Sequence, residues 1–185
     1  MWLFHQMNRQ TMKTYQAPWG KPLIVCSGLL SVLAVVSVFA AVHFRPFISP
    51  AILAPFAQWL LPLIVLGCLP FMVRSYAITD DAILIRRLFW TTCFERSALI
   101  SAEFVPHAMR KSLRTCGNGG GFSFTGWYWN KSLGFYRAFV TDLNRTVVLR
   151  FVNRTVVVSP DQPEDFVCAL NQDNSNATTG DRHHC

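Results

Sequence analysis

Two long uncharged runs dominate the first third of the chain. Residues 22–44 and 51–73 each contain 23 residues without Asp, Glu, Lys or Arg. About 20 helical residues cross the roughly 30 Å hydrocarbon core of a bilayer, and a helix satisfies its own backbone hydrogen bonds there. The pattern therefore predicts two transmembrane helices joined by the short segment 45–50. Two core helices of a soluble protein are the alternative, although soluble helices of this length usually carry a polar face.

Basic residues flank the two runs at their outer ends. The head, residues 1–21, has no acidic residue and contains three basic ones, Arg9, Lys13 and Lys21. Arg74 follows the second run directly, whereas only Arg45 lies between the runs. Because Lys and Arg favour the cytoplasmic side, we expect both termini in the cytoplasm. A signal peptide cleaved at residues 38–40 is the alternative, but its apolar stretch is usually only 7–15 residues long.

From residue 75 onward the pattern changes to short β-type runs separated by turn-forming residues. The expected strands are 76–79, 82–87, 99–105, 109–115, 134–141, 146–151 and 155–158. Pairs such as Asp80-Asp81 and Asn144-Arg145 separate neighbouring runs in the manner of hairpin turns. Seven short strands linked mostly by turns predict a small antiparallel barrel or sandwich.

The C-terminal part changes from a strand pattern to a helical one. Three apolar residues recur at helical spacing, namely Phe166, Val167 and Leu170. We expect a helix over 161–170 that buries this face over one opening of the barrel. Residues 171–185 are polar and have no apolar face, which is typical of a disordered tail.

Six short motifs follow one another between residues 74 and 170. They are Tyr76-Ala-Ile-Thr, Ile83-Leu-Ile-Arg, Gly117-Asn-Gly-Gly, Gly126-Trp-Tyr-Trp-Asn, Leu133-Gly-Phe-Tyr and Val158-Ser-Pro-Asp. In this order they resemble bacterial pleckstrin-homology-like (PH) domains. The resemblance implies a seven-stranded antiparallel barrel of two near-orthogonal sheets, with a C-terminal helix closing one end. Many bacterial members follow two membrane-spanning helices, so it also implies a transmembrane hairpin in the bacterial inner (plasma) membrane.

The hairpin that corresponds to the first hairpin of PH domains has an acidic tip, which does not suit a phosphoinositide ligand. Eukaryotic members that bind phosphoinositides cluster Lys and Arg in this hairpin. Here its tip is Asp80-Asp81, and Arg86 and Arg87 lie beyond the tip. We therefore assign no phosphoinositide site to this hairpin.

The segment 109–134 is rich in glycine but lacks the spacing of a nucleotide site. Trp127 follows Gly126 where a phosphate loop requires Lys. Phe122 occupies the third glycine position of a dinucleotide-binding motif. We therefore expect no cofactor, and the glycines instead permit a mobile loop or a bulged hairpin.

The same segment contains aromatic and basic residues that are candidates for binding. Phe122, Phe124, Trp127 and Trp129 alternate along the sequence, as strand side chains on one side would. One interpretation places these rings in the domain core, and the other places residues 127–129 in the membrane interface. Nearby cations would then meet anionic headgroups. The candidate lipid- or partner-binding residues are Arg110, Lys111, Arg114, Trp127, Tyr128, Trp129 and Lys131.

Composition narrows the remaining function classes. The chain is 51% hydrophobic and only 15% charged, against about 25% charged in soluble proteins, and its net charge of +7 suits an anionic membrane surface. Neither the five histidines nor the six cysteines form a metal or nucleophile motif. We therefore expect no catalytic or metal site and no small-molecule substrate. Residues 74–170 hold 12 basic and 8 acidic side chains, too even a balance to predict nucleic-acid binding.

These patterns predict a membrane-anchored, non-enzymatic cytoplasmic module for interaction or assembly, which binds protein partners or copies of itself. Attachment to a membrane raises the effective concentration of the domain near its partners, so weak contacts become sufficient for binding. The alternative is a peripheral sensor of anionic lipids that uses segment 109–134.

Overall fold

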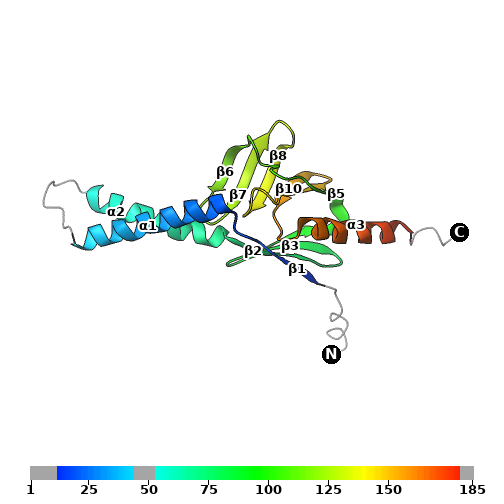
Figure 1. Cartoon of the computed structure of the whole chain (residues 1–185), viewed down its shortest axis with the longest axis horizontal. Helices are drawn as coiled ribbons and strands as arrows, with labels where there is room; N and C mark the ends of the chain where they lie inside the picture. The colour runs from blue at the N-terminus through cyan, green and yellow to red at the C-terminus, as the bar shows by residue number, and fades with distance from the viewer. Residues whose placement is uncertain (1–11, 44–52, 180–185) are drawn as a thin grey trace, which may run out of the picture.

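The computed structural model describes residues 12–43 and 53–179, which form a helix pair and a domain of two sheets and a third helix (Figure 1). The helices are α1 (Lys21–His43), α2 (Leu53–Cys68) and α3 (Pro163–Thr179), with short 3₁₀ helices η1 (Leu69–Phe71) and η2 (Arg96–Ala98). The first sheet contains, in spatial order, β1 (Lys13–Gln16), β2 (Val73–Ile78), β3 (Ala82–Arg87) and β4 (Thr91–Glu95). The second contains β5 (Leu99–Phe104), β9 (Val147–Phe151), β10 (Arg154–Val158), β8 (Gly134–Val140), β7 (Phe124–Asn130) and β6 (Leu113–Gly119).

α1 and α2 pack against each other and project together from the sheets (Figure 1). The apolar stretch Lys21–Ala40 of α1 is only 17% buried, so most of its side chains are not covered by protein. By length and composition, this stretch is the one helix in the described part of the chain that qualifies as a membrane span.

Residues 51–73, which were predicted to form a second membrane-spanning helix, do not form a single long helix. α2 has 16 residues, or about 24 Å at 1.5 Å per residue, which is less than the roughly 30 Å apolar core of a bilayer. The helix ends at Cys68, because Pro70 has no amide hydrogen to continue the helical hydrogen bonds. The chain turns through η1 and enters β2 at Val73.

The segment before α1 and the segment after α2 belong to the same sheet. β1 pairs antiparallel with β2, and Tyr15 lies opposite Tyr76. The start of α1 and the end of α2 are therefore held at the same end of the helix pair. Part of the predicted separate head thus belongs to the folded domain. Cleavage at residues 38–40 would remove β1 and the buried Leu23, which counts against the signal-peptide alternative.

The main core lies where the two sheets and α3 meet. Phe166 of α3 is fully buried, and its ring centroid lies 5.0 Å from that of Tyr15 and 6.3 Å from that of Tyr76. The buried Arg96 guanidinium donates hydrogen bonds to the carbonyl oxygens of Ala169 (3.0 Å) and Leu170 (3.1 Å). Apolar packing and these charge-assisted hydrogen bonds together fix α3 against the domain.

The predicted closed barrel of seven strands is wrong. The described residues form ten strands in two sheets that are not joined by strand pairing. β10 lies between β9 and β8 and pairs in parallel with β8, so the second half of the domain is not a simple antiparallel meander. The chain passes from the first sheet to the second at η2, and the edge strands β4 and β6 do not pair with each other.

Several predicted boundaries also differ from the structure. The strand expected at 109–115 is β6 at Leu113–Gly119, because His107 and Lys111 both take φ of 57° and turn the chain. The sequence did not predict β1, β4 or β7. α3 continues to Thr179 rather than ending at residue 170, since no glycine or proline interrupts it before Gly180. The expected tail residues 180–185 lie outside the described residues.

Candidate functional site

Aromatic side chains surround the end of the domain from which the helices project. They form an aromatic collar that consists of Trp19, Phe71, Phe89, Trp90 and Phe122. The ring of Trp19 lies 6.3 Å from that of Phe122, and the ring of Phe71 packs edge-on to Trp90 at 5.5 Å. Phe89 and Trp90 are exposed on the turn between β3 and β4. Trp side chains, which combine an apolar ring with a polar N–H, favour the membrane–water interface, so Trp19 and Trp90 would suit that depth.

The glycine-rich segment rests on the base of the helix pair. The Ser27 hydroxyl of α1 donates to the carbonyl oxygen of Gly120 (3.4 Å) and accepts a hydrogen bond from the amide of Phe122 (3.0 Å). Gly121 lies so near Cys68 of α2 that an added Cβ would be 3.2 Å from its Sγ. The loop between β6 and β7 therefore joins both helices to the second sheet.

The glycines of this segment have a conformational role, as the bulged-hairpin interpretation predicted. Gly117 and Gly126 lie opposite each other on β6 and β7, with φ of 119° and 149°. The ladder shifts register between Arg114 and Cys116. Only glycine adopts these φ values readily and allows the two backbones to come this close.

The candidate aromatics on β7 face two different sides of the sheet. Trp127 and Trp129 face the side of the main core, whereas Tyr128 is buried in a second cluster on the opposite side. The Tyr128 hydroxyl donates to the carbonyl oxygen of Asn118 (2.9 Å), and burial raises its pKa to about 12. Tyr128 is therefore a core residue and not part of a binding surface.

The expectation that Phe122 and Phe124 share one side with Trp127 and Trp129 is wrong. Phe124 packs with the Tyr128 cluster, and Phe122 precedes β7 with φ of 65°. The alternation of strand side chains has a period of two, so residues 124 and 127 point in opposite directions.

The candidate basic residues are all exposed, and most of them gather at one end of the second sheet. Asn130 donates to the carbonyl oxygen of Ala108 and to the hydroxyl of Ser112, both at 3.0 Å, which joins the turn after β7 to the turn before β6. These two turns carry Arg110, Lys111 and Lys131. Arg114 lies apart from them on β6, where it donates to the carbonyl oxygen of Gly117 (3.2 Å). β6 is the edge strand on the side from which α1 and α2 project (Figure 1).

An apolar row crosses three neighbouring strands and is largely uncovered. It consists of Leu113, Trp127, Trp129 and Phe135. Leu113 lies opposite Trp129, which in turn lies opposite Phe135. Leu113 and Phe135 are 66% and 67% exposed. Clustered large apolar side chains at a surface are typical of contact sites for another molecule.

Two arginines stack on one phenylalanine between the apolar row and the aromatic collar. The guanidinium carbons of Arg87 and Arg137 lie 4.7 and 5.0 Å from the ring centroid of Phe139. Arg87 also lies over Trp90 at 5.3 Å, and Arg137 over Trp127 at 5.8 Å. Burial lowers the pKa of Arg87 to about 10, and the charge of Arg137 contributes to that shift. No local sequence pattern indicates this cluster, because its members come from β3, β7, β8 and a turn.

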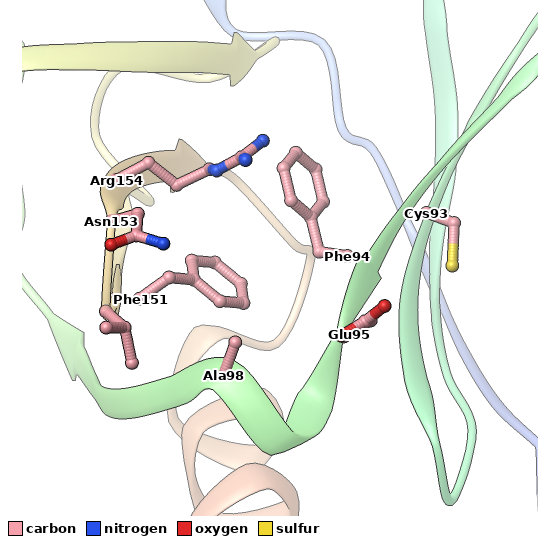
Figure 2. Close-up of a pocket in the computed structure, with 8 residues that line it drawn as sticks. Cys93, Phe94, Glu95, Ala98, Phe151, Asn153 and Arg154 are labelled. Atoms are coloured by element: carbon pink, nitrogen blue, oxygen red, sulfur yellow. The ribbon is translucent and has the colours of Figure 1, made fainter.

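A pocket of about 300 Å³ lies between β4 and the turn that joins β9 to β10. Its Phe94 and Phe151 rings lie 5.4 Å apart, and Arg154 and Glu95 are its charged residues. Figure 2 shows that the Cys93 side chain points away from these rings. Among the described residues, no group of three His, Cys, Asp or Glu side chains is placed to hold a metal ion.

Comparison with protein families gives one match. Residues 74–174 match the family model described as "Bacterial PH domain". No match was found among curated proteins or among solved structures. The matched region covers β2 to the middle of α3, and thus the two sheets without β1.

Proposed function

Because the chain belongs to the bacterial PH domain family, whose fold suggests a module for interaction or lipid binding, we propose that it is a membrane-anchored, non-enzymatic interaction module. α1 and α2 form a hairpin in the bacterial inner membrane, with both termini in the cytoplasm. The PH domain lies at the membrane surface and binds protein partners or another copy of this chain.

The observation that carries the membrane part of the proposal is the uncovered helix pair. The apolar surface of α1 is only 17% buried, although a core helix of a soluble protein would be covered by its own fold. α2 is shorter than a standard span, but η1 and the collar residue Phe71 continue its apolar character toward the domain. Basic residues at both ends of the hairpin, Lys21 and Arg74, support a cytoplasmic domain.

The apolar row supports the interaction part of the proposal. Its side chains face water in the isolated chain, and they lie on rigid strands rather than on a loop. A partner that covered Leu113 and Phe135 would remove this apolar area from water, which is the main favourable contribution to association. Confinement to a membrane makes even a small contact of this kind effective.

Phe135→Ser tests the apolar row, and Val152→Ser is a matched control. Both residues are 67% exposed, and Val152 lies on the turn between β9 and β10, away from the row. We expect chemical crosslinking in membranes to join the wild type and the control to a partner or a second copy. Phe135→Ser reduces this product at least fivefold without lowering Tm. Recovery of monomers alone from all three proteins contradicts the proposal.

A lipid sensor is the second candidate function, and the position of β6 favours it. This edge strand lies on the side of the domain from which the helix pair projects (Figure 1), and it carries Arg114, whose guanidinium lies near Gly117 and Gly119 toward the loop that rests on α1. Arg110 and Lys111 lie in the turn at the other end of β6. Each cation near an anionic membrane surface contributes about 1 kcal/mol of attraction. Crosslinks to protein favour the first function, whereas crosslinks from β6 to photoreactive lipid favour the second.

A further inference from the structure

The two stacked arginines have more positive charge than the surrounding structure neutralises. Arg87 is only 7% exposed, and its one side-chain hydrogen bond runs from Nη2 to the hydroxyl of Thr92 (3.0 Å). Its Nε is buried and is the one buried side-chain nitrogen or oxygen in the described residues without a hydrogen-bond partner. A buried donor that is left without a partner costs free energy, and a charged one costs more.

Arg137 adds a second cation without a counterion. Its guanidinium makes no hydrogen bond or ion pair with any residue in the ranges that the structure describes. Burial lowers its pKa, and the charge of Arg154 lowers it further. The aromatic rings beneath the two guanidiniums offset only part of this cost, since a cation–π contact is weaker than an ion pair with a desolvated anion.

We propose that Arg87 and Arg137 form a binding site for a phosphate oxyanion, with Trp90 and Trp127 as its walls, and that the headgroup phosphate of an anionic phospholipid occupies it. Guanidinium groups match phosphate geometry because they donate two parallel N–H bonds from a rigid plane. The free Nε–H of Arg87 and the free donors of Arg137 supply these bonds. The site lies at the opposite end of the β2–β3 hairpin from its acidic tip, Asp80-Asp81.

The location of Arg87 favours a lipid phosphate over a soluble one. Arg87 lies opposite Val73, the first residue of β2 after the helix pair, and its neighbour Trp90 packs on Phe71 of η1. If α1 and α2 are embedded, the site lies at the depth of the headgroups. This choice of ligand therefore rests on the proposed membrane attachment, whereas the anion site itself does not.

Access to the site depends on the tryptophan walls. Trp90 and Trp127 are 42% and 45% exposed, and Trp90 lies in a turn that is closed by the hydrogen bond from the Arg87 amide to its carbonyl oxygen (3.0 Å). Because Trp90 lies in this turn and not in a strand, a rotation of its ring away from the Arg87 guanidinium would leave the strand pairs intact. Binding then changes the surroundings of an indole ring, which gives a fluorescence signal.

The test uses the full chain in dodecyl maltoside micelles, titrated with inorganic phosphate and, separately, with short-chain phosphatidylglycerol. The wild type is compared with Arg87→Met and Arg137→Gln, and Arg86→Gln is the matched control from the other face of β3. We expect saturating ligand to raise the Tm of the wild type and of the control by roughly 5 °C. The two site variants lose this rise and bind at least tenfold more weakly, and their Tm without ligand is unchanged or higher.

The outcomes separate this inference from the proposed function. A response to phosphatidylglycerol alone supports a lipid ligand, and an equal response to inorganic phosphate supports the same site with a soluble phosphate. If neither probe changes the Tm of the wild type, the inference is overturned. It is also overturned if Arg137→Gln responds to the probes as strongly as the wild type does. Flotation with phosphatidylcholine vesicles is measured in parallel. A wild type that floats but binds no anion contradicts only the site, whereas one that does not float contradicts membrane attachment.

Discussion

Gly126→Ala is expected to destabilise the domain by about 3 kcal/mol or more and to lower Tm by roughly 10 °C. The φ of Gly126 is 149°, which a residue with a side chain rarely adopts. A Cβ at this position would overlap the carbonyl oxygen of Cys116 and lie 2.8 Å from Cα of Gly117. Since both contacts are with backbone, the β6–β7 ladder has to separate. The measurement is thermal unfolding of the full chain in detergent, followed by near-UV circular dichroism.

Gly134→Ala is the matched control for this experiment. Its φ is also positive, at 69°, but nothing lies within 4 Å of an added Cβ. The control therefore measures the effect of backbone strain without steric overlap. We expect it to lower the free energy of unfolding by only about 1 kcal/mol. Equal losses in the two variants would show that β6 and β7 do not approach each other closely at Gly126.

Tyr15→Ala is expected to release the segment before α1 from the domain and to cost about 3 kcal/mol. The Tyr15 ring is buried on Phe166, and its strand is the outermost of the first sheet. Loss of the ring leaves β1 with its backbone pairing to β2 and the hydrogen bond from the Asp161 amide to the carbonyl oxygen of Gln16 (3.0 Å). We expect trypsin to cut after Lys13 at least tenfold faster in this variant, while the protein stays in the membrane.

Thr14→Ala is the control for β1, because Thr14 is exposed on the same strand. A change at such a site usually alters stability by less than about 0.5 kcal/mol. If trypsin cut Tyr15→Ala and Thr14→Ala at the same rate, β1 would not be part of the domain in solution.

The elements with strong local patterns were predictable from the sequence. The apolar run of α1, the hairpin of β2 and β3 around Asp80-Asp81, and the start of α3 all follow from short-range rules of periodicity and turn chemistry. The family match at residues 74–174 supports the PH assignment over the whole predicted range, 74–170.

The remaining features depend on contacts between distant parts of the chain. β1 is four residues long and is a strand because β2 lies beside it. The parallel pairing of β10 with β8 is set by tertiary packing rather than by a local signal. The candidate binding residues came from one continuous segment of the sequence. Side chains alternate between the two faces of a strand, so Tyr128 lies on the opposite face of the sheet from Trp127 and Trp129. Arg87 and Arg137 are 50 positions apart, so no motif could indicate them.

Thiol labelling in spheroplasts tests the membrane hairpin most directly. Single cysteines are placed at Thr14, Ser49 and Glu103 after the six native cysteines are replaced. We expect an impermeant maleimide to label Ser49→Cys in intact spheroplasts, and to label Thr14→Cys and Glu103→Cys only after the membrane is opened. Labelling of Glu103→Cys from outside, or labelling of Thr14→Cys and Glu103→Cys from opposite sides, would contradict a cytoplasmic domain carried by two membrane-embedded helices.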